Sequence, residues 1–85
     1  MSRLRFRVES VLADRGIVLA RAMDTGDVKL TPHATLGARP VARFELPRKV
    51  RDDGSQDLGV VGFFLAYAAD VIHFPIGAVV VYSDD

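Results

Sequence analysis

Apolar and charged residues alternate along the first segment of the chain. Leu4, Phe6 and Val8 take one set of alternate positions, and three arginines and a glutamate take the other set. Because successive side chains of a strand point to opposite faces, this period of two predicts a half-buried β-strand. Residues 17–23 are mostly apolar, and the polar turn before them ends in Gly16. The two segments therefore predict a β-hairpin in which Gly16 adopts a left-handed conformation.

Three shorter segments continue the β pattern. Residues 28–30 and 34–36 each predict a short strand. The Thr-Pro-His sequence between them interrupts the pairing, because proline cannot donate to a sheet ladder. Residues 41–46 alternate again and predict a strand that places Val41 on one face and Phe44 on the other.

The longest apolar run, residues 58–69, is apolar on both faces. Periodicity does not distinguish a buried strand from a buried helix in such a run, but its glycines, paired valines and aromatics favour a strand. Residues 47–57, just before it, are the most polar stretch of the chain, which is typical of a mobile loop. Residues 75–82 are rich in valine and predict the final strand.

These elements predict an all-β fold. About six short strands with tight turns and no helical period are typical of a small closed antiparallel β-barrel. Closure is favoured because it removes sheet edges that would otherwise pair with other chains. A length of 85 residues makes one domain, so residues 1–85 are assigned to a single β-barrel.

Composition narrows the choice of partners. Eleven basic and eleven acidic side chains cancel, whereas a dedicated nucleic-acid-binding protein usually has a basic excess. The chain contains no cysteine, so hydrophobic packing, or packing against a partner, must stabilise it. The start of the chain lacks the apolar stretch of a signal peptide, and residues 58–69 fall short of the roughly 20 residues that cross a membrane. We expect a soluble protein of the cytoplasm that does not bind membranes.

The residue types needed for catalysis are sparse. No serine lies in a nucleophile-elbow sequence, and thiol mechanisms require a cysteine that the chain lacks. Asp70 and His73 offer two metal ligands, but a catalytic zinc ion needs three, and His33 lies in a separate turn. The sequence therefore predicts no catalytic residues, no metal site and no cofactor, and the protein is not expected to be an enzyme.

Two groups of basic residues are candidates for contacts to phosphate. The first group shares one face of the first strand, with a spacing of roughly 6.5–7 Å along it, and the second lies in the polar stretch. The candidate nucleic-acid-binding residues are Arg3, Arg5, Arg7, Arg48, Lys49 and Arg51. The interpretation that we favour for the strand is a solvated face that keeps the protein soluble.

Three aromatic residues are candidates for a protein interface. On a strand, Phe63 and Phe64 face opposite sides, and the interior of a small barrel absorbs only one of them. The other side, with Tyr67, either meets a partner or is covered by residues 47–57. The sequence leaves both interpretations open.

The order of the segments resembles the β-barrel domain, often called domain 2, that follows the GTPase domain in translational elongation factors such as elongation factor Tu. In that family an apolar strand, a glycine turn and a valine-rich strand come first. A polar turn with glycine, a lysine-containing strand and two glycine-containing strands follow. The corresponding segments here are residues 6–11, 15–21, 25–30, 59–65 and 76–80. The resemblance spans nearly the whole chain and implies the same barrel, in an RNA or ribosomal setting.

The chain also departs from that family. Ala66 and Tyr67 stand where the tRNA-carrying members have an arginine that helps to bind the end of the aminoacyl-tRNA. Residues 31–34 replace a Gly-Asp pair, and Ala20 replaces a glycine of the second strand. The chain has no phosphate-binding loop sequence, so it is not itself a P-loop GTPase. The resemblance implies a fold without supplying a binding site.

Together these patterns predict a non-catalytic, stand-alone binding module. The leading hypothesis is a module that binds a protein, or a second copy of itself, through the apolar strand that carries Phe63, Phe64 and Tyr67. The alternative is an RNA-binding or ribosome-associated module that uses the arginines. A further alternative is an inhibitor or immunity-type partner protein.

Overall fold

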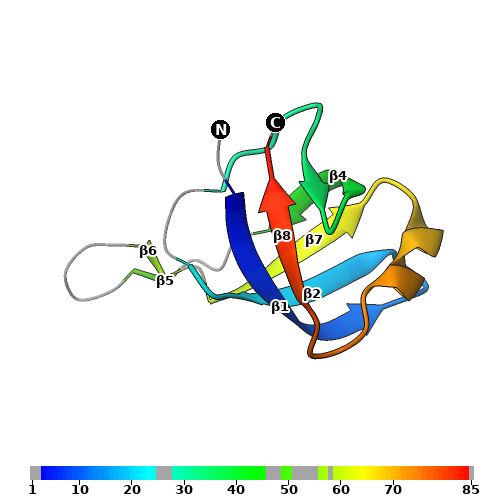
Figure 1. Cartoon of the computed structure of the whole chain (residues 1–85), viewed down its shortest axis with the longest axis horizontal. Coiled ribbons are helices and arrows are strands. Elements are labelled where there is room, and N and C mark those ends of the chain that lie inside the picture. The colour runs from blue at the N-terminus through cyan, green and yellow to red at the C-terminus, as the bar shows by residue number, and fades with distance from the viewer. Residues whose placement is uncertain (1–2, 25–27, 46–48, 51–55, 58, 85) are drawn as a thin grey trace.

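The computed structural model describes residues 3–24, 28–45, 49–50, 56–57 and 59–84. Six antiparallel strands form a closed barrel in the order β1-β2-β7-β4-β3-β8, and β8 pairs with β1 to close it (Figure 1). The barrel strands are β1 (Arg3–Leu12), β2 (Ile17–Ala22), β3 (Thr35–Leu36), β4 (Arg39–Glu45), β7 (Val60–Leu65) and β8 (Val79–Ser83). A separate two-stranded sheet pairs β5 (Lys49–Val50) with β6 (Gln56–Asp57), and a 3-10 helix, η1 (Ala68–His73), follows β7. The predicted all-β, closed antiparallel barrel is confirmed.

The first hairpin forms as its alternating pattern predicts. The side chains of Leu4, Phe6 and Val8 are buried, whereas the residues between them are exposed. The pairing of β1 with β2 shifts its register after Val8, which is a β-bulge that lets Val11 also pack against the core. Gly16 ends the turn with a φ of 66°, as predicted.

A second bulge corrects the prediction for β4. The alternation of residues 41–46 placed Val41 and Phe44 on opposite faces. In the structure the register of β4 against β7 shifts between Val41 and Arg43. The extra residue reverses the alternation, so both Val41 and Phe44 pack against the core.

Two other predicted strands differ from the structure. Residues 28–30 were predicted to be a strand but join no ladder; instead Val28 is buried in the core, and the main-chain carbonyl of Lys29 accepts a hydrogen bond from the Tyr82 hydroxyl. The final strand begins at Val79 rather than at residue 75, because a turn in which Gly77 has a φ of 90° precedes it. The expected mobile loop at residues 47–57 lies largely outside the described residues.

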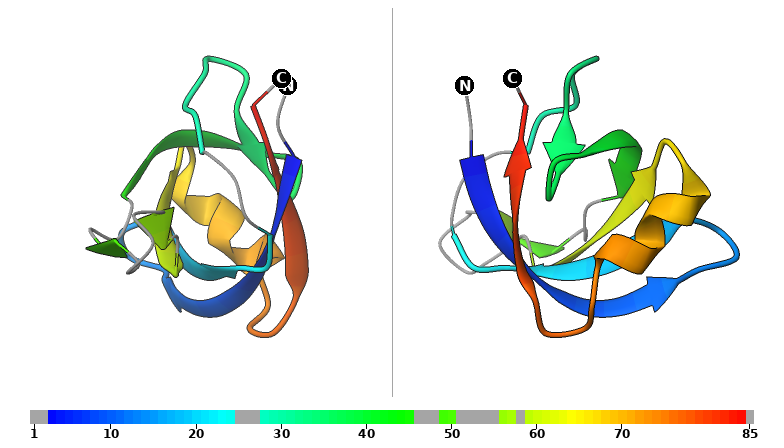
Figure 2. Two further views of the ribbon diagram at one scale, coloured as in Figure 1. Left: turned by 90° about the vertical axis from the view of Figure 1, so that its left-hand side faces the viewer. Right: turned by 45° about the vertical axis from the view of Figure 1, so that its right-hand side comes forward.

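The apolar run at residues 58–69 contains the end of one element and the start of another. The strand that the sequence favoured is confirmed for Val60–Leu65, but a 3-10 helix begins at Ala68. Val71 and Phe74, three residues apart, are both buried, which matches the three residues per turn of this helix. The expectation that no helical period would occur was therefore wrong here. Figure 2 shows η1 alongside the barrel at the end where the β1–β2 hairpin turns.

Aromatic rings fill the centre of the barrel. The Phe6 and Phe63 rings meet edge to face with centroids 4.9 Å apart, and the Phe63 and Tyr82 centroids are 5.5 Å apart. Phe44 approaches Tyr82 edge to face at 6.1 Å. Such ring pairs contribute roughly 0.5–1.5 kcal/mol each beyond the burial of their area. Burial, and then the Asp84 carboxylate, raise the pKa of the Tyr82 phenol.

The two ends of the described chain are neighbours. Arg3 of β1 is paired with Ser83 of β8, and both ends lie on the same side of the barrel (Figures 1 and 2). Within the described residues, no helix combines the length and the apolar character that crossing a membrane requires.

Candidate interaction surfaces

Phe63 is a core residue. Its side chain is fully buried and its ring packs between Phe6 and Tyr82. In the folded barrel it therefore has no surface to offer a partner, which corrects its inclusion among the candidate interface residues. Its neighbour Phe64 points the other way, as alternation along a strand requires.

Phe64 lies half-buried on the outer face of the barrel. The guanidinium carbon of Arg43, its cross-strand neighbour on β4, lies 3.9 Å from the centre of the Phe64 ring, within range of a cation–π contact. Ile17, the neighbour on β2, is buried beside it. Among the described residues, Arg43 therefore covers part of Phe64; the side chains of residues 47–57, the alternative cover considered from the sequence, lie outside the described residues.

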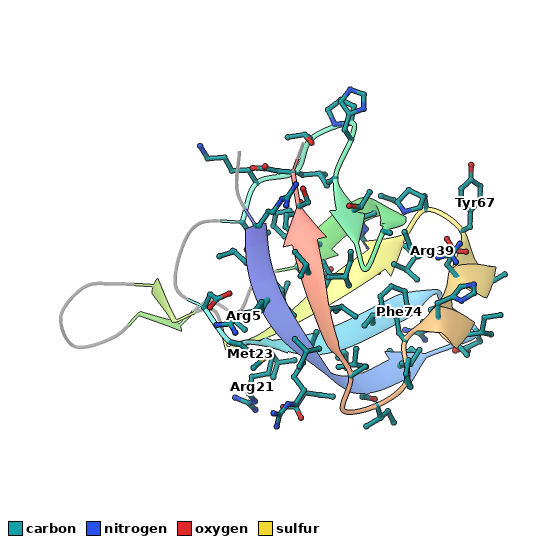
Figure 3. All side chains as sticks on the ribbon, in the orientation of Figure 1. Arg5, Arg21, Met23, Arg39, Tyr67 and Phe74 are labelled. Atoms are coloured by element: carbon teal, nitrogen blue, oxygen red, sulfur yellow. The ribbon has the colours of Figure 1, made fainter. Side chains whose placement is uncertain are left out.

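The most exposed apolar side chains of the described residues include Tyr67, which was a predicted interface residue, and two isoleucines that were not. Tyr67, Ile72 and Ile76 are 67%, 79% and 73% exposed, which makes them the most exposed large apolar side chains of the described part of the protein. All three belong to the segment that joins β7 to β8, and we call them the connection patch. Figure 3 shows Tyr67 pointing away from the barrel beside η1.

Buried contacts hold the segment that carries the connection patch. Val71 and Phe74 insert their side chains into the core, and the Phe74 amide donates a hydrogen bond to the Val71 carbonyl. On the barrel side, Gly16 lies so close to Ala68 that a Cβ atom added at Gly16 would be 2.8 Å from the Ala68 Cα atom. The patch therefore sits on a backbone that is packed against the barrel.

Ile72 and Ile76 were missed by the sequence reasoning. A signal was present, because the three-residue spacing of Val71 and Phe74 identifies the buried side of a 3-10 turn and leaves Ile72 outside. Periods of 2 and 3.6, which identify strands and α-helices, do not reveal this spacing of three.

Arg5, in the middle of the predicted arginine row, is already paired. Its main-chain N–H donates to Asp24 Oδ2 at 2.8 Å, and its Nε and Nη2 atoms donate to the two carboxylate oxygens at 3.1 and 2.7 Å (Figure 3). These hydrogen bonds lower the pKa of Asp24 to about 2 and raise the pKa of Arg5. The guanidinium of Arg5 is thus committed to a carboxylate of the same chain.

The remaining predicted arginines differ in their surroundings. Arg3 and Arg7 are exposed on the same face of β1 as Arg5, which confirms their shared orientation. Arg21 of β2 lies directly opposite Arg7, and its Nε atom donates to Glu9 Oε1 at 2.6 Å. In the other predicted cluster, Arg48 and Arg51 lie outside the described residues, and Lys49 is described only as part of the backbone of β5.

The described part of the chain brings no group of three or more histidine or acidic side chains together in a way that would hold a metal ion. Both histidines are exposed, His33 in the turn before β3 and His73 in η1. Asp70, the predicted companion of His73, instead faces Arg39, with Arg39 Nη1 3.9 Å from Asp70 Oδ1.

A scan against protein-family models finds no matching family, and searches of curated proteins and of solved structures find no match to this chain.

Proposed function

We propose that this protein is a non-catalytic binding module that docks a protein partner through the connection patch. One observation carries the proposal. The three most exposed large apolar side chains of the described chain lie within ten residues of one another, on the single segment between β7 and β8. Exposed large apolar side chains are typical of protein–protein interfaces, in which tyrosine is enriched.

The connection patch is not needed to complete the core. Phe6, Phe63 and Tyr82 fill the barrel, and the inward side of η1 is occupied by Val71 and Phe74. Tyr67, Ile72 and Ile76 therefore lie outside this core. Because their backbone is packed against the barrel, little ordering is required on binding, which favours affinity.

An RNA-binding function is the competing proposal. The six-strand closed antiparallel barrel is compatible with the domain 2 type of translational elongation factors, which supports a ribosomal setting. Against it, the Arg5 and Arg21 guanidinium groups are paired with Asp24 and Glu9, so fewer charges are left to replace the counterions of a nucleic acid. We therefore favour a protein partner. A cytoplasmic location is part of the same proposal.

The test is capture of partners from the soluble fraction of the native cells by the tagged protein and its variants. Ile72→Lys places a charge in the connection patch, and we expect it to weaken capture about 10- to 30-fold, the loss typical of a central interface residue. Leu30→Lys is the matched control, because Leu30 is 47% exposed and lies outside the patch. Half of each sample is treated with RNase.

Partners that persist after RNase treatment and are lost with Ile72→Lys alone support the proposal. Partners that vanish with RNase support the RNA alternative. Equal losses in the two lysine variants contradict a role for the patch. Sedimentation equilibrium on the purified proteins tests the special case of a second copy, since self-association through the patch must weaken with Ile72→Lys and not with Leu30→Lys.

A further inference from the structure

Two arginines face each other across the first hairpin. Arg7 of β1 and Arg21 of β2 are register partners in the antiparallel pair, and both are exposed on the outer face of the barrel. Like charges directly opposite each other destabilise a sheet, because the Cβ atoms of such a pair are only about 4.5–5.5 Å apart. The fold therefore tolerates a local repulsion at this position.

Only one of the two charges is compensated within the described chain. Glu9 pairs with Arg21 at 2.6 Å, and Asp24 is held by the neighbouring Arg5. Arg7 forms no ion pair or hydrogen bond through its side chain to any described residue. Among the described residues, its positive charge therefore has no carboxylate partner.

Apolar side chains border that charge on its other side. Val79 of β8 is the register partner of Arg7, and Val81 is the partner of Arg5. These valines are 51% and 42% exposed, although they lie within a barrel strand. Val79 and Val81 are two residues apart, so their side chains are separated by roughly 6.5–7 Å, the repeat of any extended chain.

We propose that this face, formed by Arg7, Val79 and Val81, binds an extended acidic peptide segment of another protein. A glutamate or aspartate of the peptide pairs with the Arg7 guanidinium. Apolar residues at alternate positions of the peptide contact Val79 and Val81. None of these three residues belongs to the connection patch, so the proposal goes beyond the function proposed above and is tested by variants of its own.

Charge complementarity favours a carboxylate peptide over a nucleic acid. A polyanion gains affinity by meeting many free cations, whereas here the neighbouring Arg5 and Arg21 already have carboxylate partners. A single carboxylate needs only one free guanidinium, with which it forms a fork of two hydrogen bonds. The exposed valines add contacts that suit an apolar side chain and offer nothing to a phosphate.

The experiment is a titration of the isotope-labelled protein followed by amide chemical shifts. The probes are a nine-residue peptide with two valines two residues apart, a glutamate two residues outside the pair on each side and serine at the other positions, the same peptide with glutamine in place of glutamate, and a ten-nucleotide oligouridylate. The protein variants are Arg7→Gln and, as the control with the same change of charge, Arg15→Gln. Arg15 is exposed in the β1–β2 turn, away from the proposed face.

We expect the acidic peptide to shift amides of β1 and β8. Arg7→Gln should weaken its binding about threefold to fivefold, as should the exchange of glutamate for glutamine, which is the upper part of the range of an exposed ion pair. The two changes combined should weaken it by less than the product of the separate effects, because they remove one interaction. Arg15→Gln should leave the affinity unchanged.

Three results would overturn the proposal. The first is an absence of binding of the acidic peptide, and the second is an equal effect of Arg7→Gln and Arg15→Gln. The third is tighter binding of the oligouridylate with loss of that binding in Arg7→Gln, which would assign the face to nucleic acid.

Discussion

The contact between Gly16 and Ala68 predicts how η1, in the middle of the segment that carries the connection patch, depends on the first hairpin. Gly16 has a φ of 66°, and a Cβ atom at that position would lie 2.8 Å from the Cα and 2.9 Å from the Cβ of Ala68. Gly16→Ala therefore adds two penalties. The left-handed backbone costs about 1–2 kcal/mol for an L-residue. The overlap with the Ala68 backbone costs about 1–3 kcal/mol more, because η1 must shift to relieve it.

Gly77 provides the matched control. Its φ is 90°, also in the left-handed half of the map, but nothing lies within 4 Å of a Cβ atom added there. Gly77→Ala should thus carry the backbone penalty alone, about 1–2 kcal/mol. Gly16→Ala should lower the free energy of unfolding by about 2–5 kcal/mol in total.

Urea denaturation followed by circular dichroism measures both variants. For a domain of this size, each 1 kcal/mol corresponds to about 4–8 °C in the thermal midpoint, so thermal unfolding gives a second measurement of the same difference. If Gly16→Ala is no more destabilising than Gly77→Ala, the packing of η1 against the hairpin turn does not constrain the fold, and the backbone of the connection patch is not held in place by it.

Three further predictions concern the core and one surface ion pair. Tyr82→Phe removes the hydrogen bond to the Lys29 carbonyl and should cost about 0.5–1.5 kcal/mol in urea denaturation, with little change in packing. Phe63→Ala should cost about 3–5 kcal/mol, because it empties the centre of the aromatic cluster. Asp24→Asn should lower stability at pH 6 but not near pH 2. The pKa of Asp24 is about 2 in the folded state and near 3.9 when unfolded, so the stabilising pair with Arg5 is present above pH 4 and is lost as the pH falls toward 2.

Each of these predictions has a contradicting outcome. A loss for Tyr82→Phe as large as that for Phe63→Ala would mean that the hydroxyl, and not the ring, stabilises this part of the core. A loss within about 0.5 kcal/mol for Phe63→Ala is the behaviour of a surface residue and would place that ring outside the core. A difference between Asp24→Asn and the parent protein that stays constant from pH 6 to pH 2 would show that the carboxylate charge contributes nothing.

The sequence was sufficient for the architecture because local rules and the fold agree along most of the chain. The strict alternation of apolar and charged residues in β1 is compatible only with a strand that is buried on one face. The turn before β2 needs a left-handed residue, which Gly16 supplies. The prediction failed where one extra residue in a strand changes the face to which the following side chains point. The bulge in β4 turns the Phe44 side chain toward the core, on the side opposite to the one predicted. Ala42 is the extra residue of this bulge, and its residue type does not indicate that a bulge forms there.

The candidate surfaces were predicted less well than the fold. The sequence assigned opposite faces to Phe63 and Phe64 correctly, but it could not say which face was the inner one, since both neighbours are apolar. It also placed three arginines in one row without showing that Asp24, 19 residues away from Arg5, folds back to neutralise one of them. Ion pairs of this kind depend on how strands come together, and a pattern along the chain does not contain that information.

Because β1 pairs with β8 from Arg3 and Ser83 onward, the strands form a closed ring. The order of the strands around this ring stays the same if the chain is joined between β1 and β8 and opened elsewhere. A short linker would join β1 to β8 across the ladder that they already share. The protein is therefore suited to circular permutation, with new ends opened in the turn before β3. By the same geometry it can be placed within a loop of a host protein, because its entry and exit points are adjacent and need not disturb the host fold.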